Sequence, residues 1–259
     1  MSLLKVEAKK ALLLFFVLFI TWHIIYFANW VLNGIDWLLA YLLVLVVLVC
    51  FFVLDKQKLG DLGLERVSMW KRYVLVGFLF AIFIILAWAG ISLVLPTTFH
   101  EIFNYGVWSI PYNALFALVV GLVEETSFRG YILRNLRSVC SDAKAIVYSS
   151  VLFGLYHISF VSVLLSTTPA SQTFTFWSSY VLFTFIVGSF LGYFSANTQQ
   201  TTIGTISHHS SHIFLSSLIP IGLATSFTIG HLVSTSAYLI VFPFLILLKR
   251  KGWLSHPSS

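Results

Sequence analysis

Charged residues are scarce in this sequence. Asp, Glu, Lys and Arg make up only 9% of its 259 residues, whereas soluble domains carry roughly 25%. Cysteine is scarce as well, because Cys50 and Cys140 are the only two, and they have neither the number nor the spacing of a metal site or a disulfide framework. A Gly-rich phosphate-binding loop is also absent. These absences exclude a soluble globular domain, a disulfide-stabilised domain and a P-loop nucleotide-binding fold.

Hydrophobic residues make up 59% of the chain and gather in long runs. A bilayer core of about 30 Å needs roughly 20 apolar residues in a helix. Backbone groups in lipid must be hydrogen-bonded within their own segment, so such runs form helices. The sequence therefore predicts an all-α, polytopic membrane protein with about eight transmembrane helices. The predicted spans are Leu12–Leu32, Trp37–Leu54, Tyr73–Leu95, Pro111–Leu133, Ala145–Leu164, Trp177–Asn197, Ile203–Pro220 and Val233–Leu248.

The basic residues are distributed on one side. With eight spans, every Lys and Arg except Arg129 falls on the same side of the membrane. The positive-inside rule places that side, with both termini, in the cytoplasm. The net charge of +6 follows from this asymmetry, so it indicates no nucleic-acid partner. The short loops favour a multi-pass protein of a bacterial plasma membrane.

Three ionisable residues, Glu124, Glu125 and Arg129, lie inside one predicted span. Charged groups at such positions are costly and usually functional. Glu125 and Arg129 are four residues apart, so they share a helix face and can pair. Glu124 is rotated by about 100° and faces a different neighbour. A structural Glu–Arg clamp would need only the pair, whereas Glu124 stays available for chemistry.

Histidines lie in two of the later spans: His157 in one, and His208, His209 and His212 in another. A single histidine in a helix is more often structural than catalytic. At 1.5 Å per residue, however, Glu124, His157 and His208 lie about 15, 20 and 8 Å from the basic ends of their helices. Because these depths are compatible, we expect these three side chains to meet in one polar cavity that opens toward the cytoplasmic half.

These residues resemble the three motifs of the CPBP intramembrane proteases. That family comprises the type II CAAX prenyl endopeptidases and the Abi-type bacterial proteins linked to bacteriocin processing and self-immunity. The resemblance covers residues 108–220 and implies a catalytic core of four helices. Residues 1–107 would then supply three further helices and a cytoplasmic loop, and residues 221–259 the last helix and a basic tail. The motifs are Glu124-Glu125-x-x-x-Arg129 with Phe128 and Gly130, Phe153-x-x-x-His157, and His208-x-x-x-His212.

The resemblance implies an intramembrane endopeptidase that hydrolyses a peptide bond with an activated water molecule. Carried over from the family, Glu124 is the general base, His157 helps to orient or deprotonate the water, and Arg129 holds Glu125. The reaction would be a CAAX-type, leader-peptide or peptide-maturation cleavage. The expected partners are a peptide or membrane-protein substrate and the lipid bilayer. No sequence feature indicates an oligomeric state.

The third motif departs from the family pattern. The family has Asn or Asp four residues after its His, whereas His208 is followed there by His212. Taking His209 instead would leave Ile213 at that position, so His208 is preferred because it keeps a polar residue. His208 and His212 would then stabilise the developing oxyanion. A zinc ion held by His157, His208 and His212 is equally compatible with the residues, so the peptidase is either glutamate-dependent or a metalloprotease.

Two other functions are compatible with these residues. A non-catalytic membrane immunity or regulatory protein of the same fold would keep the first two motifs and could lose the third. A transporter or proton relay would also place Glu and His inside the membrane. It would, however, be expected to show interrupted helices and internal repeats, and the sequence shows neither.

Overall fold

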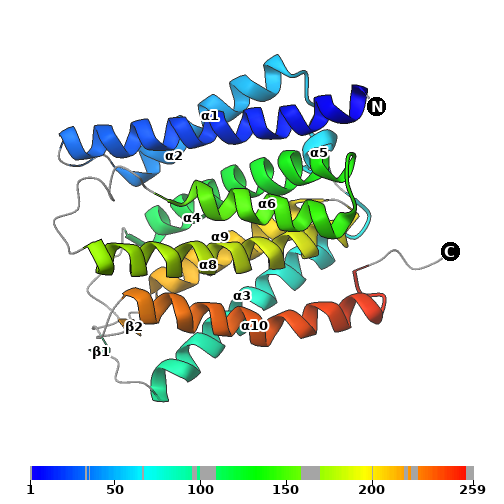
Figure 1. Ribbon diagram of the computed structural model, residues 1–259. Helices are drawn as coiled ribbons and strands as arrows, with labels where there is room; N and C mark the ends of the chain where they lie inside the picture. Colours follow the sequence, from blue (N-terminus) through cyan, green and yellow to red (C-terminus); the bar gives the residue numbers. More distant parts are fainter. Residues whose placement is uncertain are drawn as a thin grey trace.

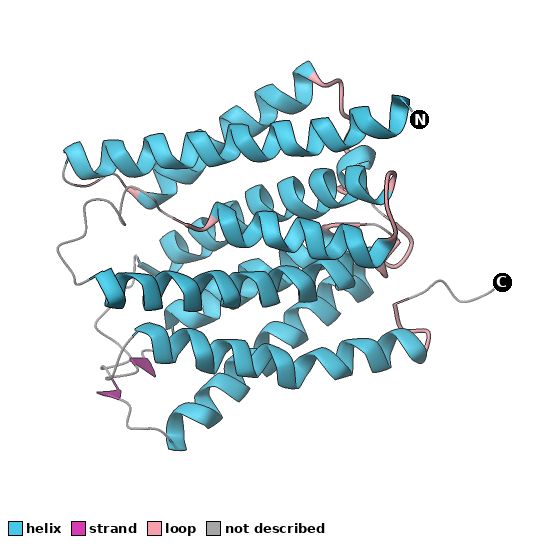
Figure 2. Ribbon diagram, in the orientation of Figure 1, coloured by secondary structure: helices cyan, strands magenta, loops and turns pink. Residues whose placement is uncertain are grey.

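The computed structural model describes residues 2–32, 34, 36–65, 67–94, 98–99, 109–158, 170–199, 201–218, 221–222 and 227–254. Nearly all of these residues are helical (Figure 2). Two short strands, β1 (Thr98–Phe99) and β2 (Ile221–Gly222), pair antiparallel, with Thr98 opposite Gly222. The predicted all-α class is confirmed.

Eight long helices carry the fold in the described residues, as the sequence predicted. Consecutive long helices run in opposite directions (Figure 1). The fourth is continuous from α4 through the wider turns of η2 into α5, and a 3-10 turn, η1 (Gly60–Leu62), lies between α2 and α3. The helices are α1 (Ser2–Leu32), α2 (Trp37–Leu54), α3 (Trp70–Val94), α4 (Ser109–Glu125), η2 (Thr126–Leu133), α5 (Arg134–Arg137), α6 (Asp142–Tyr156), α8 (Ala170–Ala196), α9 (Ile203–Leu218) and α10 (Phe227–Arg250).

The long helices form two layers of four (Figure 1). In one layer α2, α4, α9 and α3 lie side by side, and in the other α1, α6, α8 and α10. At one edge α1 packs on α2, and at the other α10 packs on α3, so the layers close into one bundle. Helices from residues 1–107, 108–220 and 221–259 share these layers, and the division into three domains stays a prediction.

Hydropathy located the spans well but not all of their ends. Helix α2 has the predicted bounds, whereas α1 begins at Ser2 instead of Leu12. A helix can continue beyond the apolar run because its backbone hydrogen bonds do not depend on lipid. The predicted span Ala145–Leu164 also differs, since α6 ends at Tyr156. Residues 159–164 of that span, and 219–220 of the seventh, lie outside the described residues.

Within the described residues, five helices are long and apolar enough to cross a membrane by themselves: α1, α2, α3, α8 and α10. The α-helical segments α4, α6 and α9 are 17, 15 and 16 residues long, and α4 continues into η2. The predicted Glu and His residues lie in α4 and α9 and, for His157, directly after α6. Each of the three lies between neighbours within its layer, so other helices cover much of its surface. The polar residues are thus concentrated where the bundle shields them.

Two close helix contacts depend on glycine. Gly77 of α3 lies against Gly204 of α9, and a Cβ on Gly77 would overlap the carbonyl oxygen of Gly204. Gly121 of α4 lies against Ser210 of α9, where an added Cβ would meet the Ser210 hydroxyl and come within 3.1 Å of the Ser210 backbone nitrogen. Small residues allow helices in membranes to approach closely. Helix α9 is therefore held near both α3 and α4, and its histidines come close to the glutamates.

Lys and Arg gather at one end of the bundle, where the first turns of α1 and the last turn of α10 lie (Figure 1). Polar contacts link the helices at this basic end. Lys10 Nζ lies 3.3 Å from Asp55 Oδ1, and the Tyr131 hydroxyl donates to Asp55 Oδ2 at 2.6 Å. Arg134 donates to the Gly60 carbonyl at 2.6 Å. The opposite end of the bundle, where α1 ends and α2 begins, is called the far end.

Candidate active site

The two adjacent glutamates lie at the end of α4, immediately before the π-helical turns of η2. Such turns within α-helices are rare and frequent at functional sites. Both side chains are buried, with exposures of 2% for Glu124 and 0% for Glu125. Arg129 Nε lies 3.2 Å from Glu125 Oε2, which confirms the predicted pair. The guanidinium also lies 4.3 Å from the Phe153 ring centroid and donates to the Gly188 carbonyl at 3.4 Å.

Glu124 faces a different set of neighbours, as its rotation predicted. The Tyr41 hydroxyl of α2 donates to Glu124 Oε1 at 2.7 Å. The other oxygen, Oε2, is buried and makes no hydrogen bond in the described structure. It faces two imidazole nitrogens, His157 Nε2 at 3.6 Å and His209 Nε2 at 3.8 Å. One carboxylate oxygen is therefore held in place while the other points at two histidines.

His157 follows the last residue of α6 and is oriented by that helix. Its Nδ1 lies 2.8 Å from the Phe153 carbonyl oxygen. A carbonyl can only accept, so His157 Nδ1 carries the hydrogen. In the neutral ring Nε2 then carries a lone pair, and this nitrogen faces Glu124. The predicted meeting of Glu124 and His157 is confirmed.

His209 is the third residue of this group. Its Nδ1 lies 2.8 Å from Glu125 Oε1, and a carboxylate paired with Arg129 acts as an acceptor, so Nδ1–H donates. Glu125 thus holds Arg129 through one oxygen and His209 through the other. A chain of contacts runs from Arg129 through Glu125 and His209 to Glu124.

The prediction that His208 lies in the same cavity is wrong. His208 is fully buried and does not line the cavity. Its Nδ1 lies 3.2 Å from the Gly77 carbonyl and its Nε2 lies 3.0 Å from the Tyr238 hydroxyl, so both ring nitrogens are occupied. The physical reason is the turn of about 100° between adjacent residues of a helix. His209 therefore faces α4, while His208 faces α3 and α10.

A cavity of about 460 Å³ lies beside Glu124. Half of its lining residues are Trp, Tyr or Phe, and Glu124 and three histidines are its carboxylate and imidazole groups. His212 and Ile213 both line it, so a polar side chain is present although position 213 is apolar. The lining residues are Trp22, Tyr26, Trp37, Tyr41, Phe116, Val120, Glu124, Phe153, His157, Tyr180, Phe183, Thr184, Val187, His209, His212, Ile213, Ser216 and Tyr238.

The cavity occupies the half of the bundle away from the basic end. Trp37 is the first residue of α2, and Phe116 lies in the first half of α4, so both are near the far end. The predicted opening toward the basic half is therefore wrong. The depth argument placed Glu124 correctly along its helix, but depth alone does not say on which side of a residue the packing leaves space.

The predicted metal ligands do not converge. His208 is held by Gly77 and Tyr238, outside the cavity that His157 and His212 line. Among the residues that the structure describes, no three His, Cys, Asp or Glu side chains are grouped closely enough to hold a metal ion. A structural or catalytic zinc site needs at least three such ligands. The predicted set His157, His208 and His212 therefore does not form a zinc site in the described structure.

Sequence reasoning missed Tyr41 and chose His208 over His209. Tyr41 comes from the first three helices, which carry no motif. One signal was present, since Tyr41 is the only residue with a hydroxyl in the apolar helix Trp37–Leu54. Such a group inside a membrane span usually has a specific partner.

Comparison with known protein families finds a match that covers most of the residues of this site. Residues 106–215 match the family model of the Rce1-like type II CAAX prenyl endopeptidases, which confirms the resemblance to the CPBP family. The match contains Glu124, His157 and His209, whereas Tyr41 and Tyr238 lie outside it. No curated protein matches the chain. Together with its five long apolar helices, the match identifies the chain as an integral membrane protein.

Proposed function

Because residues 106–215 match the Rce1-like family model, we propose that this chain is an intramembrane endopeptidase whose general base is Glu124. One observation carries the proposal: Glu124 Oε2 faces two histidine nitrogens at 3.6 and 3.8 Å on the wall of a cavity. These distances are slightly too long for direct hydrogen bonds and suit a bridging water molecule. A carboxylate and an imidazole that share one water molecule can remove its proton and orient it for attack on a carbonyl carbon.

In the proposed reaction Glu124 Oε2 takes a proton from the water while the water oxygen attacks the substrate carbonyl carbon. His157 orients the water through the lone pair of Nε2, since the Phe153 carbonyl holds its Nδ1–H. The tetrahedral intermediate then loses its amine when the C–N bond breaks, and the leaving nitrogen takes the proton back from Glu124. Tyr41 holds the carboxylate in position throughout.

The developing oxyanion needs a hydrogen-bond donor, and His209 is the residue placed to provide it. Glu125 accepts from Nδ1–H, which leaves Nε2 directed at the cavity, and in the proposed mechanism Nε2–H of the doubly protonated ring donates to the oxyanion. Counted from His209, the position of the family Asn is taken by Ile213, which has no donor. The neighbouring His212 lines the same cavity and can be the second donor. Oxyanion donors typically lower a barrier by about 3–4 kcal/mol.

The test is a peptidase assay on the purified full-length chain in detergent with a library of internally quenched peptides. We expect cleavage by the wild type and a loss of about 100- to 10,000-fold in Glu124→Gln, the usual contribution of general-base catalysis. Glu65→Gln, at an exposed position of the loop, is the matched control and should keep full activity. Because the described residues do not fit a metal ion, a chelator should leave the rate unchanged.

The outcomes separate this function from the alternative. Cleavage that survives Glu124→Gln would contradict the assigned base, and loss of activity on chelation would restore the metalloprotease. A folded wild type that cleaves no peptide would favour a non-catalytic immunity or regulatory protein. Ile213 in the place of the family Asn is the observation that keeps this second function under consideration.

A further inference from the structure

The cavity has a definite direction along the membrane normal. On α4 it is lined by Glu124, Val120 and Phe116, which lie at successive turns away from Arg134 and the basic end. On α2 it reaches Trp37, the first residue of the helix, which is 39% exposed. The cavity therefore extends from the level of Glu124 toward the far end of the bundle.

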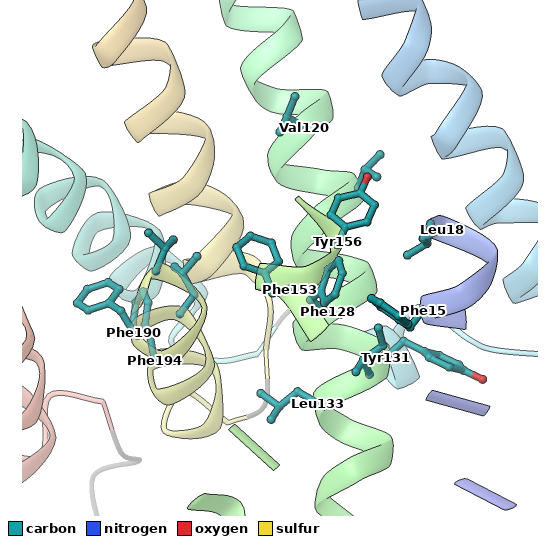
Figure 3. Packing of buried hydrophobic residues seen from close by; sticks show 14 of the residues in the cluster. Phe15, Leu18, Val120, Phe128, Tyr131, Leu133, Phe153, Tyr156, Phe190 and Phe194 are labelled. Carbon is teal, nitrogen blue, oxygen red and sulfur yellow. The ribbon is translucent and has the colours of Figure 1, made fainter. Parts of the chain in front are cut away.

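Packed side chains close the other direction. Phe128 and Tyr131 follow Glu124 toward the basic end, and Phe15 and Leu18 of α1 pack in the same cluster (Figure 3). All four are at most 6% exposed. A polypeptide could reach Glu124 from the basic end only by displacing this cluster, which close packing makes costly.

The charge distribution assigns a compartment to each end. Apart from Arg129, the Lys and Arg side chains in the described residues lie at the basic end, and the positive-inside rule makes that end cytoplasmic. We therefore propose that the site takes its substrate from the non-cytoplasmic side of the membrane. This inference rests on the proposed function and names its substrate class, an apolar polypeptide segment that reaches the site from outside the cytoplasm.

The cavity wall supports an internal segment of a chain over a free C-terminus. Among its described residues the wall has no Lys or Arg that could bind a terminal carboxylate. Arg129 is buried, and its charge is paired with Glu125. The aromatic side chains of Trp22, Tyr180 and Phe183 instead offer contact to apolar substrate side chains. A secreted peptide, or the outward-facing part of a membrane protein, fits this chemistry.

The experiment measures which side reaches the cavity. In the full-length chain with Cys50→Ala and Cys140→Ser, single cysteines are placed at Ser216, which is exposed and lines the cavity, and at Ser138, which is exposed at the basic end. Intact bacterial cells are treated with a membrane-impermeant maleimide, before and after permeabilisation. We expect Ser216→Cys to react in intact cells and Ser138→Cys to react only after permeabilisation.

The inference is overturned if Ser216→Cys reacts only after permeabilisation, or if it reacts in neither condition. Labelling requires no catalysis, and the detergent assay of Glu124→Gln has no sidedness. If the wild type cleaves peptides in detergent but Ser216→Cys reacts only after permeabilisation, the proposed side of substrate entry is wrong and the endopeptidase proposal stands. If Ser216→Cys reacts in intact cells but the wild type cleaves no peptide, the endopeptidase proposal is wrong and the side on which the cavity opens stands.

Discussion

At the scale of single residues, two neighbouring carboxylates have distinct surroundings. Glu125 is bound on both oxygens, by Arg129 and by His209. Glu124 receives one hydrogen bond, from Tyr41, and leaves Oε2 facing the cavity histidines. Charged pairs in low-dielectric surroundings hold each other firmly. Glu124 is thus suited to reaction, and Glu125 is suited to holding His209 in place.

The first prediction compares alanine substitutions of the two adjacent histidines, His208 and His209. We expect His209→Ala to lower kcat by about 100- to 1,000-fold, the usual effect of removing an oxyanion donor. His208→Ala should leave the rate per folded molecule near that of the wild type, because His208 does not reach the cavity. It should instead lower the melting temperature, since the contacts to Gly77 and Tyr238 are lost. The opposite ranking in kcat would restore the assignment made from the motif spacing.

Tyr41→Phe tests the hydrogen bond that positions Glu124. The ring would keep its packing against Trp22 and Phe116 at centroid distances of 4.9 and 5.7 Å. A hydrogen bond to a charged group contributes about 1.5–3 kcal/mol, so kcat should fall by about 10- to 100-fold while KM changes little. Tyr26→Phe removes a hydroxyl from the same cavity wall and should keep the wild-type kcat. Equal effects of the two changes would mean that Tyr41 only shapes the cavity.

At the scale of helices, α9 is positioned from two sides and at its start. Gly77 and Gly121 let α3 and α4 approach it closely. Before its first turn, the Thr201 hydroxyl and the Thr202 backbone N–H both donate to the Gly63 carbonyl at 2.9 Å. These contacts set the rotation of α9, and that rotation decides which histidine faces Glu124.

Gly77→Ala tests this close approach. The added Cβ would meet the backbone carbonyl of Gly204 and the backbone nitrogen of His208, and neither can move without shifting helix α9. Overpacking of this kind typically costs about 1–3 kcal/mol, so the melting temperature in detergent should fall. Gly90→Ala, on the same helix, is the matched control, because no atom lies within 4 Å of its added Cβ. If both variants melt together with the wild type, the α3–α9 contact is looser than described.

At the scale of the whole molecule, both layers contribute to the site. Helices α2, α4 and α9 of one layer provide Tyr41, Glu124 and His209. Helices α6 and α8 of the other provide His157 and the Gly188 carbonyl that binds Arg129. Burial between layers lets ionisable groups stay away from lipid, where they would be costly. Two of the apolar helices, α2 and α8, therefore contribute to the site together with the shorter helices that carry the ionisable residues.

The sequence alone determined the class of the protein and part of its site. Apolar length predicted the helices, and the spacing of four residues predicted the Glu125–Arg129 pair, because both depend on the geometry of a single helix. Glu124 and His157 were also identified, since intramembrane ionisable residues stand out against an apolar background.

Only the tertiary structure decided the rest. The motif spacing favoured His208, whereas His209 is the residue that faces Glu124, because the rotation of α9 in the packed bundle decides which histidine reaches the site. Tyr41 joins Glu124 across 83 residues, a pairing that no local pattern encodes. The side on which the cavity opens follows from where Phe128 and its neighbours fill the bundle. Local rules govern one helix at a time, whereas these features arise only when several helices pack against one another.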